Sequence, residues 1–88
     1  MIEKTFLIKN KLGLHARPAA LFVQIVNKYK SSVKVVKDEQ SVDGRSIMGL
    51  MMLVAEFGSG MKIIVEGADE QEVMQKLEEL IERKFDEE

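Results

Sequence analysis

Apolar and polar residues alternate in four parts of the chain, and this period of two predicts strands that are buried on one face. In the first of them, Phe6 and Ile8 would face the interior. The polar residues between the second and the third predict a hairpin turn. The predicted strands span residues 2–9, 32–37, 41–44 and 61–67, and the inward residues of the second and fourth are Val33, Val35, Met61, Ile63 and Val65.

Apolar residues spaced three and four positions apart predict a helix that begins at about Ala16. Pro18 fits only the first turn of a helix, because its missing N–H group has no hydrogen bond to make there. His15, the only histidine of the chain, would therefore lie at the N-terminus of this helix. The predicted inward stripe consists of Ala19, Phe22, Val23, Val26 and Tyr29.

A second and shorter helix is predicted over residues 46–53, which are apolar except at their start. Ser46 opens this segment, and serine is one of the residues favoured at a helix N-cap. Gly49 lies inside the segment and weakens its helical propensity.

The clearest helical pattern covers residues 69–84 near the end of the chain. Asp69 followed by Glu72 resembles a capping box, in which two side chains bind the first free N–H groups. We expect Arg83 and Lys84 in the last turn, where positive charge is favourable. The predicted inward residues are Val73, Leu77, Leu80 and Ile81.

The predicted order β-α-β-β-α-β-α indicates one domain over residues 1–88 and is typical of an antiparallel α+β sandwich. A hydrophobic content of 45% with 32% charged residues is that of a globular chain. The net charge of −2 and the pI of about 5.5 argue against a nucleic-acid binder. With no cysteine and one histidine, we expect no zinc or other transition-metal site.

No basic and apolar leader opens the chain, and no apolar run approaches the roughly 18 residues that a membrane span needs. We therefore expect a cytoplasmic protein without a membrane partner.

The segment "LGLHARPAA" (12–20) concentrates the candidate chemistry. The first N–H groups of a helix have no intrahelical partner, and with the helix dipole they favour an anion, phosphate above all. Arg17 adds a planar guanidinium that suits phosphate oxygens. A neutral imidazole is a nucleophile, so His15 beside such an anion site predicts a carrier of a phosphoryl group. The alternative is that His15 is only a helix cap or a surface residue, as a lone histidine at a helix start often is.

"GLHARPAA" together with "SIMGLM" about thirty residues later resembles HPr, the histidine-containing phosphocarrier family of the phosphoenolpyruvate-dependent sugar phosphotransferase system. The likeness covers essentially the whole chain. It implies an open-faced sandwich, with a four-stranded antiparallel sheet covered on one face by three helices. It also implies that His15 carries the phosphoryl group on Nδ1, and that Arg17 and the backbone amides of Ala16 and Arg17 stabilise it.

The resemblance further implies the partners of the chain. Enzyme I would donate the phosphoryl group and a sugar-specific enzyme IIA domain would accept it, with no cofactor. The chain would be a carrier and not an enzyme that turns over a small molecule, and we expect a monomer. Ser46 matches the position at which HPr kinase/phosphorylase modifies the Gram-positive type of HPr in carbon catabolite repression, with binding to a catabolite-control repressor. Ser46 can also serve only as a helix cap.

A group of apolar residues surrounds His15 and Ser46. A short helix cannot bury all of these side chains, and those left exposed suit the docking of a partner protein. Its members are Leu14, Ala20, Ile47, Met48 and Met51, with Met52 as a further candidate. Two features depart from the family pattern: Val54 stands where many members have Gly or Ala, and the pair Glu56–Phe57 is unusual. Both bear on partner preference more than on chemistry.

Three other functions agree with parts of the pattern. A paralogue in a nitrogen-related phosphorelay would use the same chemistry, but "SIMGLM" favours the sugar system. A regulatory HPr-like protein would bind a repressor without carrying phosphate, but proteins of that kind lack the histidine. An unrelated module that binds a small anion would require the motif to match by accident.

Overall fold

The computed structural model describes residues 1–53 and 55–86, so Val54 lies outside the described residues. The elements follow the predicted order, with a short 3-10 turn added at the end. They are β1 (Ile2–Leu7), α1 (Ala16–Val26), β2 (Ser32–Lys37), β3 (Gln40–Asp43), α2 (Ile47–Met52), β4 (Gly60–Glu66), α3 (Glu70–Glu82) and η1 (Lys84–Asp86).

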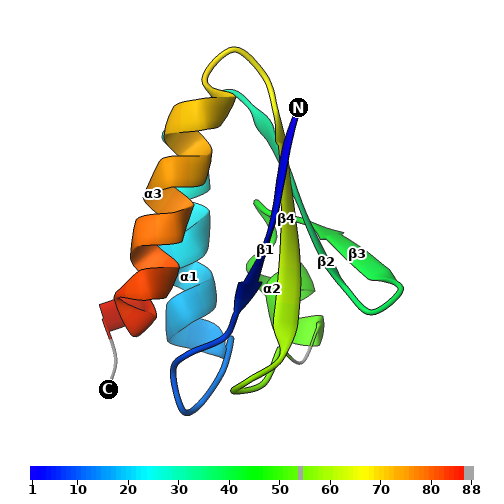
Figure 1. Ribbon diagram of the computed structural model, residues 1–88, viewed down its shortest axis with the longest axis vertical. Helices are drawn as coiled ribbons and strands as arrows, with labels where there is room; N and C mark the ends of the chain where they lie inside the picture. The colour runs from blue at the N-terminus through cyan, green and yellow to red at the C-terminus, as the bar shows by residue number, and fades with distance from the viewer. Residues whose placement is uncertain (54, 87–88) are drawn as a thin grey trace.

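The four strands form one antiparallel sheet in the order β1-β4-β2-β3. Figure 1 shows the sheet nearly edge-on, with α1 and α3 side by side against one of its faces. The shorter α2 packs against α1 and β3. This is the open-faced sandwich that the sequence predicts, and it confirms the expected fold class.

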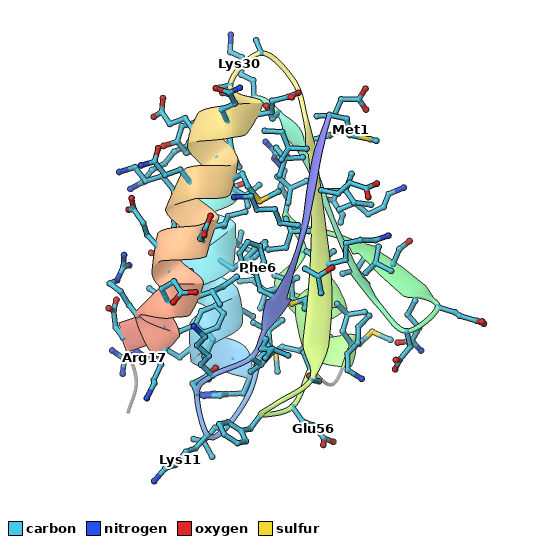
Figure 2. The ribbon with its side chains drawn as sticks, in the orientation of Figure 1. Met1, Phe6, Lys11, Arg17, Lys30 and Glu56 are labelled. Carbon is cyan, nitrogen blue, oxygen red and sulfur yellow. The ribbon has the colours of Figure 1, made fainter. Side chains whose placement is uncertain are left out.

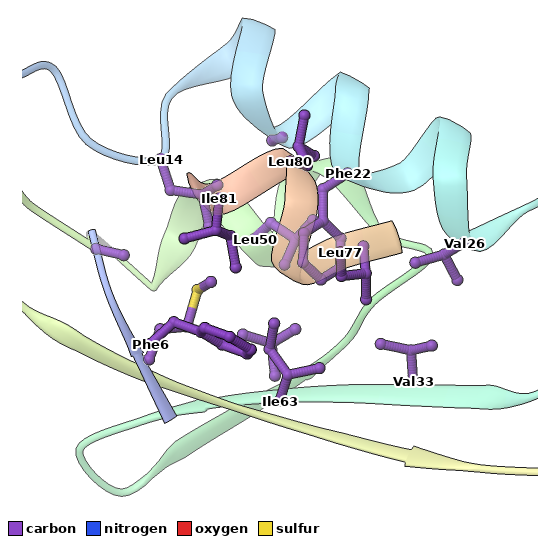
Figure 3. Packing of buried hydrophobic residues seen from close by; sticks show 14 of the residues in the cluster. Phe6, Leu14, Phe22, Val26, Val33, Leu50, Ile63, Leu77, Leu80 and Ile81 are labelled. Carbon is purple, nitrogen blue, oxygen red and sulfur yellow. The ribbon is translucent and has the colours of Figure 1, made fainter. Parts of the chain in front are cut away.

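One hydrophobic core fills the space between the sheet and the helices (Figure 3). Phe22 of α1, Ile63 of β4 and Leu77 of α3 are fully buried, so both long helices and the sheet contribute side chains to this core. The predicted inward residues of the strands and of the two long helices are buried, except Tyr29, which lies beyond the end of α1 and is half-buried. The period-two and period-3.6 patterns therefore identified the core correctly.

The predicted capping box at the start of α3 is wrong. Asp69 is the N-cap residue but makes no side-chain cap. Its carboxylate accepts hydrogen bonds from the Ser31 hydroxyl and from the backbone N–H groups of Lys30 and Ser31, the latter two at 3.0 and 3.1 Å. The Ser31 hydroxyl, followed by the Lys30 N–H, lowers the pKa of Asp69. Asp69 thus ties α3 to the loop before β2.

The end of α3 also differs from the prediction, because the helix stops at Glu82 and leaves Arg83 and Lys84 outside its last turn. Lys84, Phe85 and Asp86 adopt positive φ angles of 57, 55 and 59°. This left-handed backbone costs about 1–2 kcal/mol per residue, but it turns the Phe85 side chain into the core, where it is fully buried. The early end of the helix therefore accompanies the burial of Phe85.

Candidate functional site

His15 is the N-cap residue of α1, with φ −93° and ψ −163°. The first hydrogen bond of the helix runs from the Ala19 N–H to the His15 carbonyl oxygen at 2.9 Å. The N–H groups of Ala16 and Arg17 precede it, and Pro18 has none, so two amides point out of the helix beside His15. The structure thus places His15 and the two amides together, as the sequence predicts.

The loop before α1 is fixed by hydrogen bonds of its own. The Asn10 side-chain amide donates to the Gly13 carbonyl oxygen at 2.7 Å, and the His15 N–H donates to the same oxygen at 3.1 Å. Asn10 is fully buried, which is rare for a polar residue and fits a role in holding the loop. The position of His15 is therefore set by the loop as well as by the helix.

The environment of His15 combines exposure with positive electrostatic potential. His15 is half-buried and Arg17 is exposed, so both can be reached from solvent. The N-terminal end of α1 adds the partial positive charge of the helix dipole to the guanidinium of Arg17. In Figure 2, Arg17 lies at the same end of the molecule as the loop that carries Lys11. The arrangement can hold an anion next to an imidazole.

His15 also lines a hollow of about 240 Å³. Glu56 belongs to this hollow, although the sequence indicated it only as a departure from the family pattern. Contact between two loops far apart in sequence creates the hollow, so no local signal could predict it. Its lining consists of Leu12, Leu14, His15, Met51, Ala55 and Glu56.

Ser46 caps α2, since its Oγ accepts a hydrogen bond from the Gly49 N–H at 2.9 Å. The neighbouring Arg45 donates from its guanidinium to the carbonyl oxygens of Ser31 at 3.0 Å and Tyr29 at 2.7 Å. These bonds hold the loop after α1 against the start of α2. Ser46 therefore has a structural role. Its side chain is half-buried, immediately before the exposed residues of α2.

The exposed apolar side chains of α2 form a surface, here called the methionine surface, beside His15. Met51 belongs both to this surface and to the hollow. Met48 and Met52 are each 70% exposed, whereas Leu50 and Leu53 are buried. The side of α2 that carries Met48 and Met52 therefore faces solvent. The members of the methionine surface are Ile47, Met48, Met51 and Met52.

Two further residues that the sequence assigns to partner binding are less exposed than the methionine surface. Leu14 is only 4% exposed and belongs to the core cluster, so its assignment to an exposed docking surface is corrected. Burial of its apolar side chain in the core is favourable, and its N–H donates to the Ala55 carbonyl oxygen at 2.8 Å. Ala20 is half-buried on α1.

Within residues 1–53 and 55–86, no group of three or more acidic, cysteine or histidine side chains is placed to hold a metal ion. In the same part of the chain, no helix combines the length and the apolar character needed to cross a bilayer.

The comparisons with known proteins agree on one family. The family model described as "PTS HPr component phosphorylation site" matches residues 2–83. The chain is 42% identical over 88 residues to the phosphocarrier protein HPr of Treponema pallidum, covering 100% of both chains. It is 49% identical to the HPr-like protein Crh of Halalkalibacterium halodurans, covering 94% of this chain and 99% of that protein.

Among solved structures, the fold is similar to the crystal structure of HPr-C-His from Thermoanaerobacter tengcongensis. The TM-score is 0.95 at 52% identity, and the alignment covers 100% of this chain and 99% of that one.

Proposed function

The chain belongs to the HPr family of phosphocarrier proteins of the phosphotransferase system, and on this premise we propose that His15 is the residue that carries its phosphoryl group. The observation that carries the proposal is the position of His15 as the N-cap of α1, beside the two outward amides and Arg17. The proposed donor is phosphorylated enzyme I and the proposed acceptor is a sugar-specific enzyme IIA domain, both in the cytoplasm.

The proposed transfer needs positioning more than elaborate chemistry. The lone pair of His15 Nδ1 attacks the phosphorus, the bond between the phosphorus and enzyme I breaks, and the carrying group of enzyme I leaves with the bonding electrons. The Arg17 guanidinium and the amides of Ala16 and Arg17 hold the phosphoryl oxygens. Delivery to enzyme IIA is a second displacement: a nucleophile of enzyme IIA attacks the phosphorus, the phosphorus–Nδ1 bond breaks, and the His15 imidazole leaves with the bonding electrons.

The test is the transfer of label from phosphoenolpyruvate through enzyme I. We expect acid-labile label on the wild-type chain, none on His15→Ala, and slower labelling of Arg17→Ala with an unchanged circular dichroism spectrum. Label that persists in His15→Ala would refute the assignment. Unfolding of Arg17→Ala would show that Arg17 has a structural role instead.

Ser46 is the proposed regulatory site, modified by HPr kinase/phosphorylase with ATP. Phosphorylation adds a charge of about −1.5 to −2. Because Ser46 already caps α2 and adjoins the methionine surface, the added charge would repel acidic partner surfaces while the fold persists. Acid-stable label that is absent from Ser46→Ala supports this assignment, and label that survives the substitution contradicts it.

The similarity to Crh, which a solved structure describes as a catabolite repression HPr, favours one second candidate: a regulatory protein that binds a catabolite-control repressor. The two candidates differ in one result. A regulatory protein would be labelled at Ser46 by the kinase but would take no label from enzyme I, whereas the proposed monomeric carrier takes label at His15.

A further inference from the structure

The loop between β1 and α1 is anchored at both ends to the loop between α2 and β4. At its start, the Ile8 N–H donates to the Ser59 carbonyl oxygen at 3.0 Å. At its end, the Leu14 N–H donates to the Ala55 carbonyl oxygen at 2.8 Å. Between these two anchors, Asn10 supplies hydrogen bonds within the loop itself.

Asn10 closes a turn with Gly13 through both its backbone and its side chain. The Gly13 N–H donates to the Asn10 carbonyl oxygen at 3.2 Å, and the Asn10 side-chain amide donates to the Gly13 carbonyl oxygen at 2.7 Å. Asn10 is one of two buried polar side chains in the part of the chain that the structure describes, the other being Ser31. Burial removes the hydration of the amide, a cost that an apolar side chain of the same size would avoid. The amide at position 10 therefore indicates a requirement for its hydrogen bond.

The Gly13 carbonyl oxygen links Asn10 to His15. It accepts the His15 N–H at 3.1 Å besides the Asn10 amide. The Leu14 N–H belongs to the same rigid peptide plane and is held by Ala55. The His15 N–H alone would satisfy this carbonyl, so loss of the Asn10 bond would leave no orphaned group. What the Asn10 bond adds is the direction of the peptide plane that precedes His15.

The backbone at His15 decides where its imidazole lies against the outward amides of Ala16 and Arg17. The helix fixes the carbonyl side of His15 through the Ala19 N–H, whereas the N-terminal side of His15 depends on the loop. Transfer of a phosphoryl group relies on such placement, and a displacement of about 1 Å can lower a rate about a hundredfold. The direction of the peptide plane before His15 therefore bears on the rate of transfer.

Building on the function proposed above, we propose that Asn10 is a positioning residue for the phosphoryl transfer. Its amide fixes the Gly13 carbonyl, this carbonyl fixes the His15 N–H, and the imidazole is thereby held where the phosphoryl group meets the outward amides. Asn10 is fully buried, so it touches neither the phosphoryl group nor a partner protein. One determinant of the transfer rate then lies inside the molecule, away from the surface that partners contact.

Single-turnover transfer from phosphorylated enzyme I tests the proposal with Asn10→Leu and Asn10→Asp. Leucine fills a similar volume without a donor, and a carboxylate keeps the shape of the side chain but donates no hydrogen bond. We expect the maximal rate to fall about tenfold in Asn10→Leu and at least as far in Asn10→Asp. The half-saturating concentration should stay within about twofold, because a buried positioning residue acts on the transfer step and not on binding.

Ser31→Ala is the matched control, since it also removes the hydrogen bond of a buried polar side chain, the one to Asp69. Ser31 follows Lys30, which lies at the opposite end of the molecule from Arg17 (Figure 2). We expect Ser31→Ala to keep the maximal rate within about twofold of wild type. Urea unfolding checks that each variant is folded under the conditions of the assay.

Amide hydrogen exchange gives a readout that needs no enzyme I. Exchange at the His15 N–H should be at least about tenfold faster in Asn10→Leu than in wild type and unchanged in Ser31→Ala. In wild type, the His15 N–H should exchange more slowly than the outward N–H of Ala16. Equal exchange at these two positions would overturn the proposal even if neither variant of Asn10 folds.

The outcomes separate the positioning role from the proposed function. A maximal rate of Asn10→Leu equal to that of wild type, or lowered no more than that of Ser31→Ala, would overturn the role of Asn10 while His15 labelling stands. A rise in the half-saturating concentration alone would also overturn it, because binding and not positioning would then depend on Asn10. Absence of label on wild type would refute the proposed function itself.

Discussion

Leu14 and Ala55 are joined by a backbone hydrogen bond of 2.8 Å, one residue before His15. Gly13 precedes this bond with a φ angle of +72°, and a Cβ atom at Gly13 would lie only 2.4 Å from the Ala55 carbonyl oxygen. The bond therefore depends on the absence of a side chain at position 13. Because Ala55 also lines the hollow beside His15, Gly13 links the location of His15 to that hollow.

Gly13→Ala is expected to destabilise the protein by about 2 kcal/mol or more, since it adds a steric clash to the cost of a left-handed alanine. The matched control is Gly58→Ala, where φ is +85° but no atom lies within 4 Å of the added Cβ. We expect a loss of only about 1 kcal/mol there. Urea unfolding measures both, and equal losses would contradict the close approach of the two loops.

Ser46→Ala removes the hydrogen bond from the Gly49 N–H and should lower the free energy of unfolding by about 1 kcal/mol. Ser46→Asp should keep most of the stability, because a carboxylate caps a helix as well as a hydroxyl does. The same variant should take label from enzyme I more slowly, since it adds charge next to the methionine surface. If Ser46→Asp is as unstable as Ser46→Ala, the capping role is wrong.

Asp69 should make stability depend on pH in the acid range. Its pKa is lowered in the folded state, mainly by the Ser31 hydroxyl and then by the Lys30 N–H. The stabilising contribution is therefore complete above the unfolded-state pKa of about 3.9 and is lost as the pH falls through the folded-state pKa.

Asp69→Asn tests this contribution by denaturant unfolding between neutral pH and about pH 3. The variant should be less stable than wild type at neutral pH, and the difference should shrink as the pH falls. The lowered pKa of Glu70 adds a similar trend to both chains and cancels in the difference. A difference that stays constant with pH would contradict the role of the charged carboxylate.

Tyr29 is the only tyrosine of the chain, and there is no tryptophan, so its ionisation can be followed directly by ultraviolet absorbance. Its hydroxyl donates to the Glu72 carboxylate at 2.9 Å, and this bond raises the pKa of Tyr29 above 10.0. Glu72→Ala should return the pKa toward the ordinary value. An unchanged titration curve in Glu72→Ala would show that the hydrogen bond does not persist in solution.

Local patterns predicted most of the fold because burial follows the period of each element. Phe22 follows the helical period of 3.6 and Val33 the strand period of two, and both are buried as predicted. Pro18 predicted the start of α1 correctly. The sequence failed where a residue is controlled by a distant partner. Asp69 binds Ser31 instead of its own helix, and Phe85 is drawn into the core beyond the end of α3.

The candidate site shows the same division between local and distant information. The sequence predicts His15 and Arg17 at the start of a helix, because the residues of one short segment determine where that helix begins. It could not place Glu56 beside His15, because that requires the pairing of two loops about forty residues apart, nor could it show that Leu14 faces inward. Side chains on neighbouring loops are therefore the part of the site that only the structure reveals.

The most direct test of the central claim is mass spectrometry of the intact chain after incubation with enzyme I and phosphoenolpyruvate. A carrier gains the mass of one phosphoryl group, which maps to the peptide containing His15 and disappears after brief acid treatment. No gain in mass, or an acid-stable phosphate on another residue alone, would contradict the proposed role of His15.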